Sequence, residues 1–268
     1  MNSPTASRTA LVTGASSGIG AAVAAELVRR GYRVYGTSRD PESVTEPVPG
    51  VEYLALDLAD EESVRACAAA AGDVDVLVNN AGESQSGPFE ELPPEAVERL
   101  FRINVFGAVR LTQLVLPGMR ARRYGRVVMV GSMLASFPLA YRSSYVASKA
   151  ALKGFANALR REVSPYGVGV TTVEPGSINT GISERRTQYL REGSPFADEY
   201  RTMLEALNAN EARGISAGTV ARTIARAVEA DRPRPFHAVG SNAPVVFALR
   251  RLFPRSVILR MVARKHGL

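Results

Sequence analysis

The chain has 268 residues, 46 % of them hydrophobic, which is enough to bury one substantial core and favours one compact domain over two. Its one cysteine, Cys67, excludes an intramolecular disulfide and a cysteine-rich metal site, and the two histidines are isolated, so we expect no metal and a reducing, cytoplasmic setting. The first ten residues lack the apolar core of a signal peptide, and no apolar run approaches the roughly 18 residues of a membrane span. We therefore expect a chain that is neither secreted nor transmembrane.

The net charge of +7 is unevenly distributed. Eight cations and no anion follow Asp231, whereas residues 1–231 hold 25 cations and 26 anions. Apolar side chains are interspersed among the C-terminal cations, which is typical of an amphipathic segment and not of a nucleic-acid-binding face. We expect a nearly neutral body, a basic amphipathic extension over 241–268, and no nucleic-acid partner.

Apolar runs of strand length alternate with segments of helical length from the start of the chain. Such alternation is the pattern of βαβ units, so we predict a three-layer α/β fold with a parallel sheet between helices. Ser216 is the expected N-cap of the helix predicted over 217–229. In chain order the predicted elements are strand 9–13, helix 19–30, strands 33–37 and 51–56, helix 60–71, strand 74–78, helix 94–119, strand 126–130, helix 145–163, strand 168–173, helix 217–229 and strand 236–239.

After residue 176 the periodicity weakens, and the stretch 177–215 is predicted to act as a lid. Residues 1–240 would then form a single domain that includes this lid, and 241–268 would form the extension.

A glycine-rich turn joins the first predicted strand to an alanine-rich helix. Backbone N–H groups and the positive end of the helix dipole make such a turn a site for a pyrophosphate, although glycines at this place could also serve only to turn the chain. The spacing is Gly-x₃-Gly-x-Gly. The candidate dinucleotide-binding residues here are Thr13, Gly14, Ser16, Ser17, Gly18, Ile19 and Gly20.

The end of the second predicted strand indicates which dinucleotide fits. An acidic side chain at this place binds the ribose 2′-hydroxyl of NAD, whereas this chain has Ser38 followed by Arg39, a pair suited to a 2′-phosphate. We expect NADP(H) in preference to NAD(H). Asp40 leaves the alternative open, because a small shift of the loop would let its carboxylate reach the ribose.

Two further strand ends carry candidate cofactor contacts. Asp57 and Leu58 suit the edge of an adenine ring, and the small residues that end the fourth strand would let the backbone lie against a flat ring. Turn formation alone would also explain both segments. The residues of the second segment assigned to the cofactor are Asn80, Ala81 and Gly82.

Tyr145 and Lys149 lie four residues apart at the start of a predicted helix, hence on one face. A neighbouring cation favours the phenolate form of a tyrosine, which suits a phenol for proton transfer. Ser132 ends the fifth predicted strand beside the same crevice and could hold a substrate oxygen. Asn104, in the long predicted helix, could anchor a water that connects Lys149 to solvent, although an asparagine in a helix is more often a local hydrogen-bonding group.

Together, Thr13-Gly-x₃-Gly-Ile-Gly20, Asp57, Asn79-Asn-Ala-Gly82, Asn104, Ser132, Tyr145-x₃-Lys149 and Pro175-Gly176 resemble the short-chain dehydrogenases/reductases over residues 8–240. The resemblance implies a single Rossmann-type domain with a seven-stranded parallel sheet and a catalytic centre of Ser132, Tyr145 and Lys149, assisted by Asn104. It also implies cofactor contacts from Tyr145 and Lys149, and from Pro175, Gly176, Ile178 and Thr180. Pairing of the long helices would give a homodimer or homotetramer. The sequence is most similar to NADP-dependent carbonyl, steroid or ketoacyl reductases.

The residues expected around the reacting atoms are apolar or aromatic, which favours an apolar ketone or aldehyde as substrate, although each could equally belong to the core. They are Met133, Leu134, Phe137 and Tyr141. We expect reduction of this carbonyl or the reverse alcohol oxidation. The alternatives are a redox-neutral reaction such as epimerisation through a transient ketone, and a nucleotide-sensing protein without turnover.

The C-terminal extension fits two roles. A helix packed over the substrate pocket or against another subunit is favoured over docking on a membrane surface, which a basic amphipathic helix can also achieve.

Overall fold

The computed structural model describes residues 7–181 and 184–268. Seven parallel strands form one sheet, which confirms the seven-stranded parallel sheet that the family resemblance implied, and their order is β11–β7–β6–β4–β1–β2–β3. The strands are β1 (Thr9–Val12), β2 (Arg33–Ser38), β3 (Val51–Ala55), β4 (Val76–Asn79), β6 (Gly125–Val130), β7 (Val168–Pro175) and β11 (Phe236–Val239).

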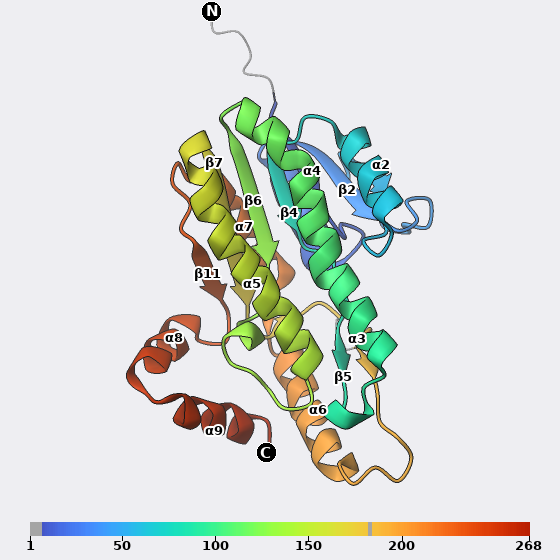
Figure 1. Cartoon of the computed structure of the whole chain (residues 1–268), viewed down its shortest axis with the longest axis vertical. Helices are drawn as coiled ribbons and strands as arrows, with labels where there is room; N and C mark the ends of the chain where they lie inside the picture. Colours follow the sequence, from blue (N-terminus) through green and yellow to red (C-terminus); the bar gives the residue numbers. More distant parts are fainter. Residues whose placement is uncertain (1–6, 182–183) are drawn as a thin grey trace, which may run out of the picture.

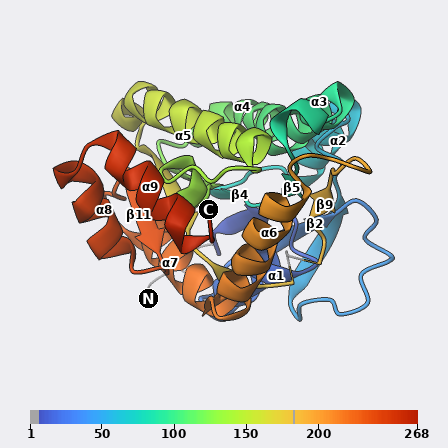
Figure 2. The same ribbon diagram turned by 90° about the horizontal axis from the view of Figure 1, so that it is seen from below.

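Helices cover both faces of the sheet (Figure 2). Helices α1 (Gly18–Arg29) and α7 (Ala217–Glu229) lie on one face, and α2 (Glu61–Ala71), α4 (Ala108–Ala121) and α5 (Ser143–Val163) lie on the other. The α7 bounds match the prediction, and the Ser216 side chain accepts a hydrogen bond from the Thr219 N–H as the expected N-cap.

The central strand β1 shows how alternating side chains build two cores. Leu11 packs into the cluster under α4 and α5 with Leu111, whereas Val12 faces the cluster under α1 and α7 with Leu27 and Ile224. All five of these side chains are fully buried, and each such burial contributes about 1.5–3 kcal/mol. The two cores fix the strand ends, and therefore the loops that follow them.

The helix predicted over 94–119 is interrupted. The structure has α3 (Pro94–Phe101), a π-helical segment (Arg102–Gly107) and then α4. Gly107 sits against the loop after β3, where an added Cβ would come within 2.3 Å of the Leu58 carbonyl oxygen. A π turn is rare and has no sequence signal comparable to a helix cap or a breaking proline, so the sequence pattern predicted one continuous helix.

The segment 177–215 is more regular than its weak periodicity predicted. It contains α6 (Ala197–Ala212), and Tyr200, Met203 and Leu207 bury one face of that helix. Residues 182 and 183 of the expected lid lie outside the described ranges. Two short parallel pairings involve this segment, that of β5 (Gln85–Ser86) with β9 (Thr187–Gln188) and that of β8 (Ile178–Asn179) with β10 (Ile215–Ser216).

The C-terminal residues form two helices, α8 (Ala243–Leu252) and α9 (Arg255–Lys265), beside the ends of β11 and α6 (Figure 1). Within 7–181 and 184–268, no helix combines the length and apolarity needed to cross a bilayer. In the same ranges no three His, Cys, Asp or Glu side chains gather as a metal site.

Candidate active site

Two adjoining cavities open at the carboxyl ends of β1, β4 and β6, where ligands bind in open parallel sheets. The larger is a cleft of about 540 Å³ along the glycine-rich turn and the end of β2. The smaller, of about 250 Å³, lies between the end of β7, the loop after β6 and the C-terminal helices. Ile19, Ser84, Gly131, Tyr145 and Thr180 line both cavities, so Tyr145 stands at their junction.

The glycine-rich turn has the backbone needed to cradle a phosphate. Gly14 and Gly18 have φ angles of +66° and +56°, which glycine adopts without strain. Helix α1 starts at Gly18, and the Ser17 side chain makes no capping hydrogen bond to the first-turn amides. Those amides remain available to an anion at the positive end of the helix dipole. The described turn therefore fits the pyrophosphate of a dinucleotide.

Thr13 and Gly20 shape this turn from beneath and do not line the cleft. The buried Thr13 hydroxyl accepts hydrogen bonds from the N–H groups of Asn80 and Ala81, both at 2.9 Å, and so ties β1 to the loop after β4. An added Cβ on Gly20 would lie 2.0 Å from the Gly14 carbonyl oxygen. The remaining residues predicted in these two loops line the cleft: Gly14, Ser16, Ser17, Gly18, Ile19, Asn80, Ala81 and Gly82.

At the end of β2, Ser38 and Arg39 line the cleft, whereas Asp40 does not. The Asp40 carboxylate accepts a hydrogen bond from the Glu42 N–H at 3.1 Å and so closes the next turn. Asp57 and Leu58 line the cleft at the end of β3.

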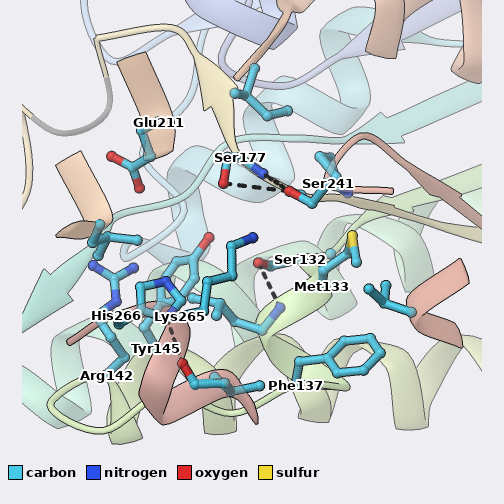
Figure 3. Close-up of a pocket in the computed structure, with 18 of the residues that line it drawn as sticks. Ser132, Met133, Phe137, Arg142, Tyr145, Ser177, Glu211, Ser241, Lys265 and His266 are labelled. Carbon is cyan, nitrogen blue, oxygen red and sulfur yellow. Dashed lines mark hydrogen bonds between the residues drawn. The ribbon is translucent and has the colours of Figure 1, made fainter. Parts of the chain in front are cut away.

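Tyr145 and Lys149 lie one turn apart in the first part of α5, both buried. The Lys149 ammonium donates to the Val130 carbonyl oxygen at 3.0 Å and lies 5.8 Å from the centroid of the Tyr145 ring. Ser132, two residues beyond β6, lines the smaller cavity with Tyr145, and Figure 3 shows both side chains in that cavity. The Ser132 hydroxyl accepts from the Leu134 N–H at 3.2 Å and keeps its own proton available. The site thus offers a phenol, a hydroxyl and an ammonium to one small molecule and its cofactor.

Asn104 lies in the π-helical segment and lines neither cavity. Its buried carboxamide accepts from the Glu83 N–H at 2.8 Å and donates to the Glu83 carbonyl oxygen at 3.0 Å and to Ser148 Oγ at 3.2 Å. An added Cβ on Gly82 would lie 2.8 Å from Asn104 Oδ1 and 3.6 Å from Lys149 Nζ. Asn104 therefore fixes the strand-end loop beside Lys149.

The segment after β7 contributes to both cavities. Pro175, Gly176 and Ile178 line the smaller cavity, and Thr180 lines both. Because the smaller cavity adjoins the cleft, Pro175, Gly176 and Ile178 lie on the side of the predicted cofactor site that faces the smaller cavity.

Met133, Leu134 and Phe137 line the smaller cavity as predicted, whereas Tyr141 does not. The Tyr141 hydroxyl lies 2.8 Å from Glu199 Oε1, and burial together with that carboxylate raises the pKa of Tyr141 to about 12. The Tyr141 ring packs edge-on against the rings of Phe196 and Tyr200 at the start of α6.

Sequence patterns did not reveal two arginines at these cavities. Arg185 lines the cleft, and its guanidinium donates to Ser17 Oγ at 3.2 Å above the phosphate turn. Arg142 is buried, and its guanidinium carbon lies 4.4 Å from the Tyr145 ring centroid. Burial, and secondarily the charge of Arg186, lowers the pKa of Arg142 to about 10, so Arg142 remains cationic at neutral pH. Neither Arg185 nor Arg142 lies in a sequence pattern that would distinguish it from an arginine on the surface.

The C-terminal helices also line the smaller cavity, which confirms that the extension packs over it. The amphipathic pattern of this segment predicts that some of its residues are buried. It does not predict which part of the domain they cover. The contributing side chains are Val246, Leu249, Ile258, Met261, Val262, Lys265 and His266.

Comparison with known proteins identifies the family. A model described as short chain dehydrogenase matches residues 8–190. The chain is 34 % identical over 245 residues to a 3-ketodihydrosphingosine reductase of Bacteroides thetaiotaomicron, an alignment that spans 89 % of this chain and 90 % of that protein. A crystal structure of a short-chain dehydrogenase from Streptomyces avermitilis is similar with a TM-score of 0.82 and 36 % identity, covering 92 % of this chain and 93 % of the other. The crystal structure of an actinorhodin polyketide ketoreductase with NADPH gives a TM-score of 0.72 and 28 % identity, with 87 % and 95 % covered. The chain therefore belongs to the short-chain dehydrogenase/reductase family and is an NAD(P)-dependent oxidoreductase.

Proposed function

We propose that this enzyme reduces the carbonyl group of an apolar small molecule, or oxidises the corresponding alcohol, with Tyr145 as the proton-transfer group. The observation that carries the proposal is the position of Tyr145 at the junction of the two cavities, one turn from Lys149 and in the same cavity as Ser132 (Figure 3). A nicotinamide in the cleft would supply the hydride.

Residues of the chain would position the carbonyl group and transfer the proton. Ser132 donates a hydrogen bond to the carbonyl oxygen and positions it, and Tyr145 transfers its phenolic proton to that oxygen as negative charge develops there. Lys149, fixed by the Val130 carbonyl, stabilises the phenolate that remains. Asn104 acts as a positioning residue through the Glu83 loop. Proton transfer of this kind contributes about 10²–10⁴-fold to a rate.

NADP(H) is the cofactor that we propose. Arg39 follows Ser38 on the wall of the cleft and can pair with a 2′-phosphate, while Asp40 is engaged in its own turn. Arg185 adds a second guanidinium above the pyrophosphate position. The similar ketoreductase that was crystallised with NADPH supports the same preference.

The substrate that we propose is an apolar ketone or aldehyde. Met133, Leu134 and Phe137 form one wall of the smaller cavity, and Val246 and Leu249 of α8 form another. A similarity to a reductase that acts on a keto lipid supports this class. We also propose that two copies pair through α5, because Ala147, Ala150 and Gly154 leave an exposed face on which helices can approach closely.

The experiment is a panel of ketones and aldehydes of increasing alkyl length, assayed by the loss of NADPH absorbance for the wild type, Ser132→Ala and Ser164→Ala. Ser164 is exposed and lies at the end of α5, so its variant is the matched control. We expect turnover of apolar carbonyls, a loss of about 10²-fold or more in kcat for Ser132→Ala, and no change for the control. An absence of NADPH consumption across the panel, or unchanged kcat in Ser132→Ala, would contradict the proposal.

A further inference from the structure

Helices α8 and α9 have two different sides. Their inner side covers the smaller cavity with Val246, Leu249, Ile258 and Val262. Phe247 adds edge-on contacts to Phe137 at 5.0 Å and to Phe236 at 4.9 Å between ring centroids. The extension is therefore anchored to the domain, and its outer side is a fixed surface.

The outer side exposes large apolar side chains. Val245 and Leu252, two turns apart on α8, are 59 % and 76 % exposed. Phe253 and Leu259 continue this exposed set into the connecting turn and α9, whereas Met261, although 46 % exposed, also lines the smaller cavity. Five of the nine large apolar side chains that are most exposed in the described residues thus lie within this short segment. Such concentration on one part of a surface marks an interaction site.

Exposed cations lie among these apolar side chains. Among the described residues, the guanidinium groups of four of these cations form no hydrogen bond and no ion pair, and the sequence has no acidic residue after Asp231. The surrounding body is nearly neutral, so this positive charge is local and calls for an anionic partner. The cations are Arg251, Arg255, Arg260 and Arg264. Arg250 is also exposed, but its guanidinium carbon lies 6.0 Å from the centroid of the Phe137 ring and so faces the inner side.

We propose that the outer side of α8–α9 docks on an anionic lipid bilayer. A bilayer surface accepts both features at once, because apolar side chains enter the acyl boundary while arginines bind lipid phosphates. A second copy related by a two-fold axis would place this arginine-rich face against itself. A nucleic acid would leave Val245, Leu252 and Leu259 without an apolar environment.

Docking would also place one wall of the substrate cavity against the bilayer, because the same two helices form that wall. An apolar carbonyl dissolved in the membrane would then lie next to its cavity. This consequence rests on the proposed function, whereas the docking itself does not.

The test is co-sedimentation of the full chain with vesicles of phosphatidylcholine alone and of phosphatidylcholine mixed with phosphatidylserine. Two double variants remove one feature each, Arg251→Gln with Arg255→Gln and Leu252→Ser with Phe253→Ser. All four residues are exposed, so the variants are expected to fold, and circular dichroism with thermal unfolding checks this. The matched controls are Arg33→Gln and Phe89→Ser, which change an exposed arginine and an exposed phenylalanine on other parts of the surface.

We expect the wild type to bind the mixed vesicles, with binding weakened by salt. Each arginine removed should lower the partition coefficient about fivefold, and the apolar pair should lower it at least about tenfold. The controls should bind as the wild type does. Wild-type protein that remains in the supernatant with mixed vesicles would overturn the proposal, as would double variants that bind like the controls. Self-association or nucleic-acid binding that the double variants abolish, without vesicle binding by the wild type, would assign the surface to that partner instead. Because this readout needs no turnover, failure of the proposed reaction would leave its result interpretable.

Discussion

Replacement of Arg39 by alanine should weaken the binding of NADPH and leave the binding of NADH almost unchanged. Arg39 lines the cleft directly after β2, and no described residue forms an ion pair with it, so its charge is free to pair with a 2′-phosphate. A hydrogen bond to a charged group contributes about 1.5–3 kcal/mol, and the exposure of Arg39 to salt reduces this to about 1–2 kcal/mol. The Kd for NADPH should therefore rise about 5–30-fold, since 1.4 kcal/mol corresponds to a tenfold change.

The assay is titration of the dinucleotide fluorescence with protein, for NADPH and NADH in parallel. NADH lacks the 2′-phosphate, so its Kd should change by no more than about twofold. Arg33→Ala is the matched control, because Arg33 lies at the opposite end of the same strand and pairs with Glu52 at 3.3 Å. An equal loss of affinity for both dinucleotides, or no loss for NADPH, would refute the assignment of Arg39 to the phosphate.

Three further predictions concern stability and access. The hydrogen bond from Arg29 lowers the pKa of Glu26 to about 2, so the ion pair stabilises the fold above about pH 5 and is lost as the pH falls toward 2. Glu26→Gln should therefore cost about 1 kcal/mol in urea unfolding at neutral pH, less than about half of that near pH 3 and almost nothing near pH 2, and an equal cost at neutral pH and pH 2 would contradict this. Burial raises the pKa of Cys67 to about 11, so iodoacetamide should label the thiol only in denaturant, and rapid labelling of the native protein would show that the thiol is accessible. Gly20→Ala places a Cβ 2.0 Å from a carbonyl oxygen of the phosphate turn and should abolish measurable NADPH binding, whereas Gly154→Ala meets no atom within 4 Å and should bind NADPH normally.

The strands and helices could be predicted from the sequence because burial of one face places apolar residues at a regular spacing in each element. The strand Phe236–Val239 and the helix Ala217–Glu229 have the predicted bounds, since apolar spacing and a serine cap act locally. The π-helical segment was not predicted, because a π turn is rare and has no sequence signal comparable to the residues that start and stop a helix.

The candidate site was predictable where a local motif carries it. The glycine turn, Ser38 and Arg39, and the Tyr145–Lys149 pair all lie at the cavities. Residues whose position depends on long-range packing were missed or misplaced. Arg185 reaches Ser17 across 168 positions, and Tyr141 turns away to Glu199 because its loop packs on α6. No pattern within a short window contains that information.

The role of Tyr145 in proton transfer is tested most directly by single-turnover reduction of a carbonyl with bound NADPH, measured for the wild type, Tyr145→Phe and Tyr166→Phe. Tyr166 is 43 % exposed beyond α5, so its variant controls for the loss of a phenolic hydroxyl. We predict that Tyr145→Phe binds NADPH with unchanged affinity and reacts at least about 10²-fold more slowly, while Tyr166→Phe reacts like the wild type. A Tyr145→Phe enzyme that reduces the carbonyl at the wild-type rate would contradict the proposed mechanism.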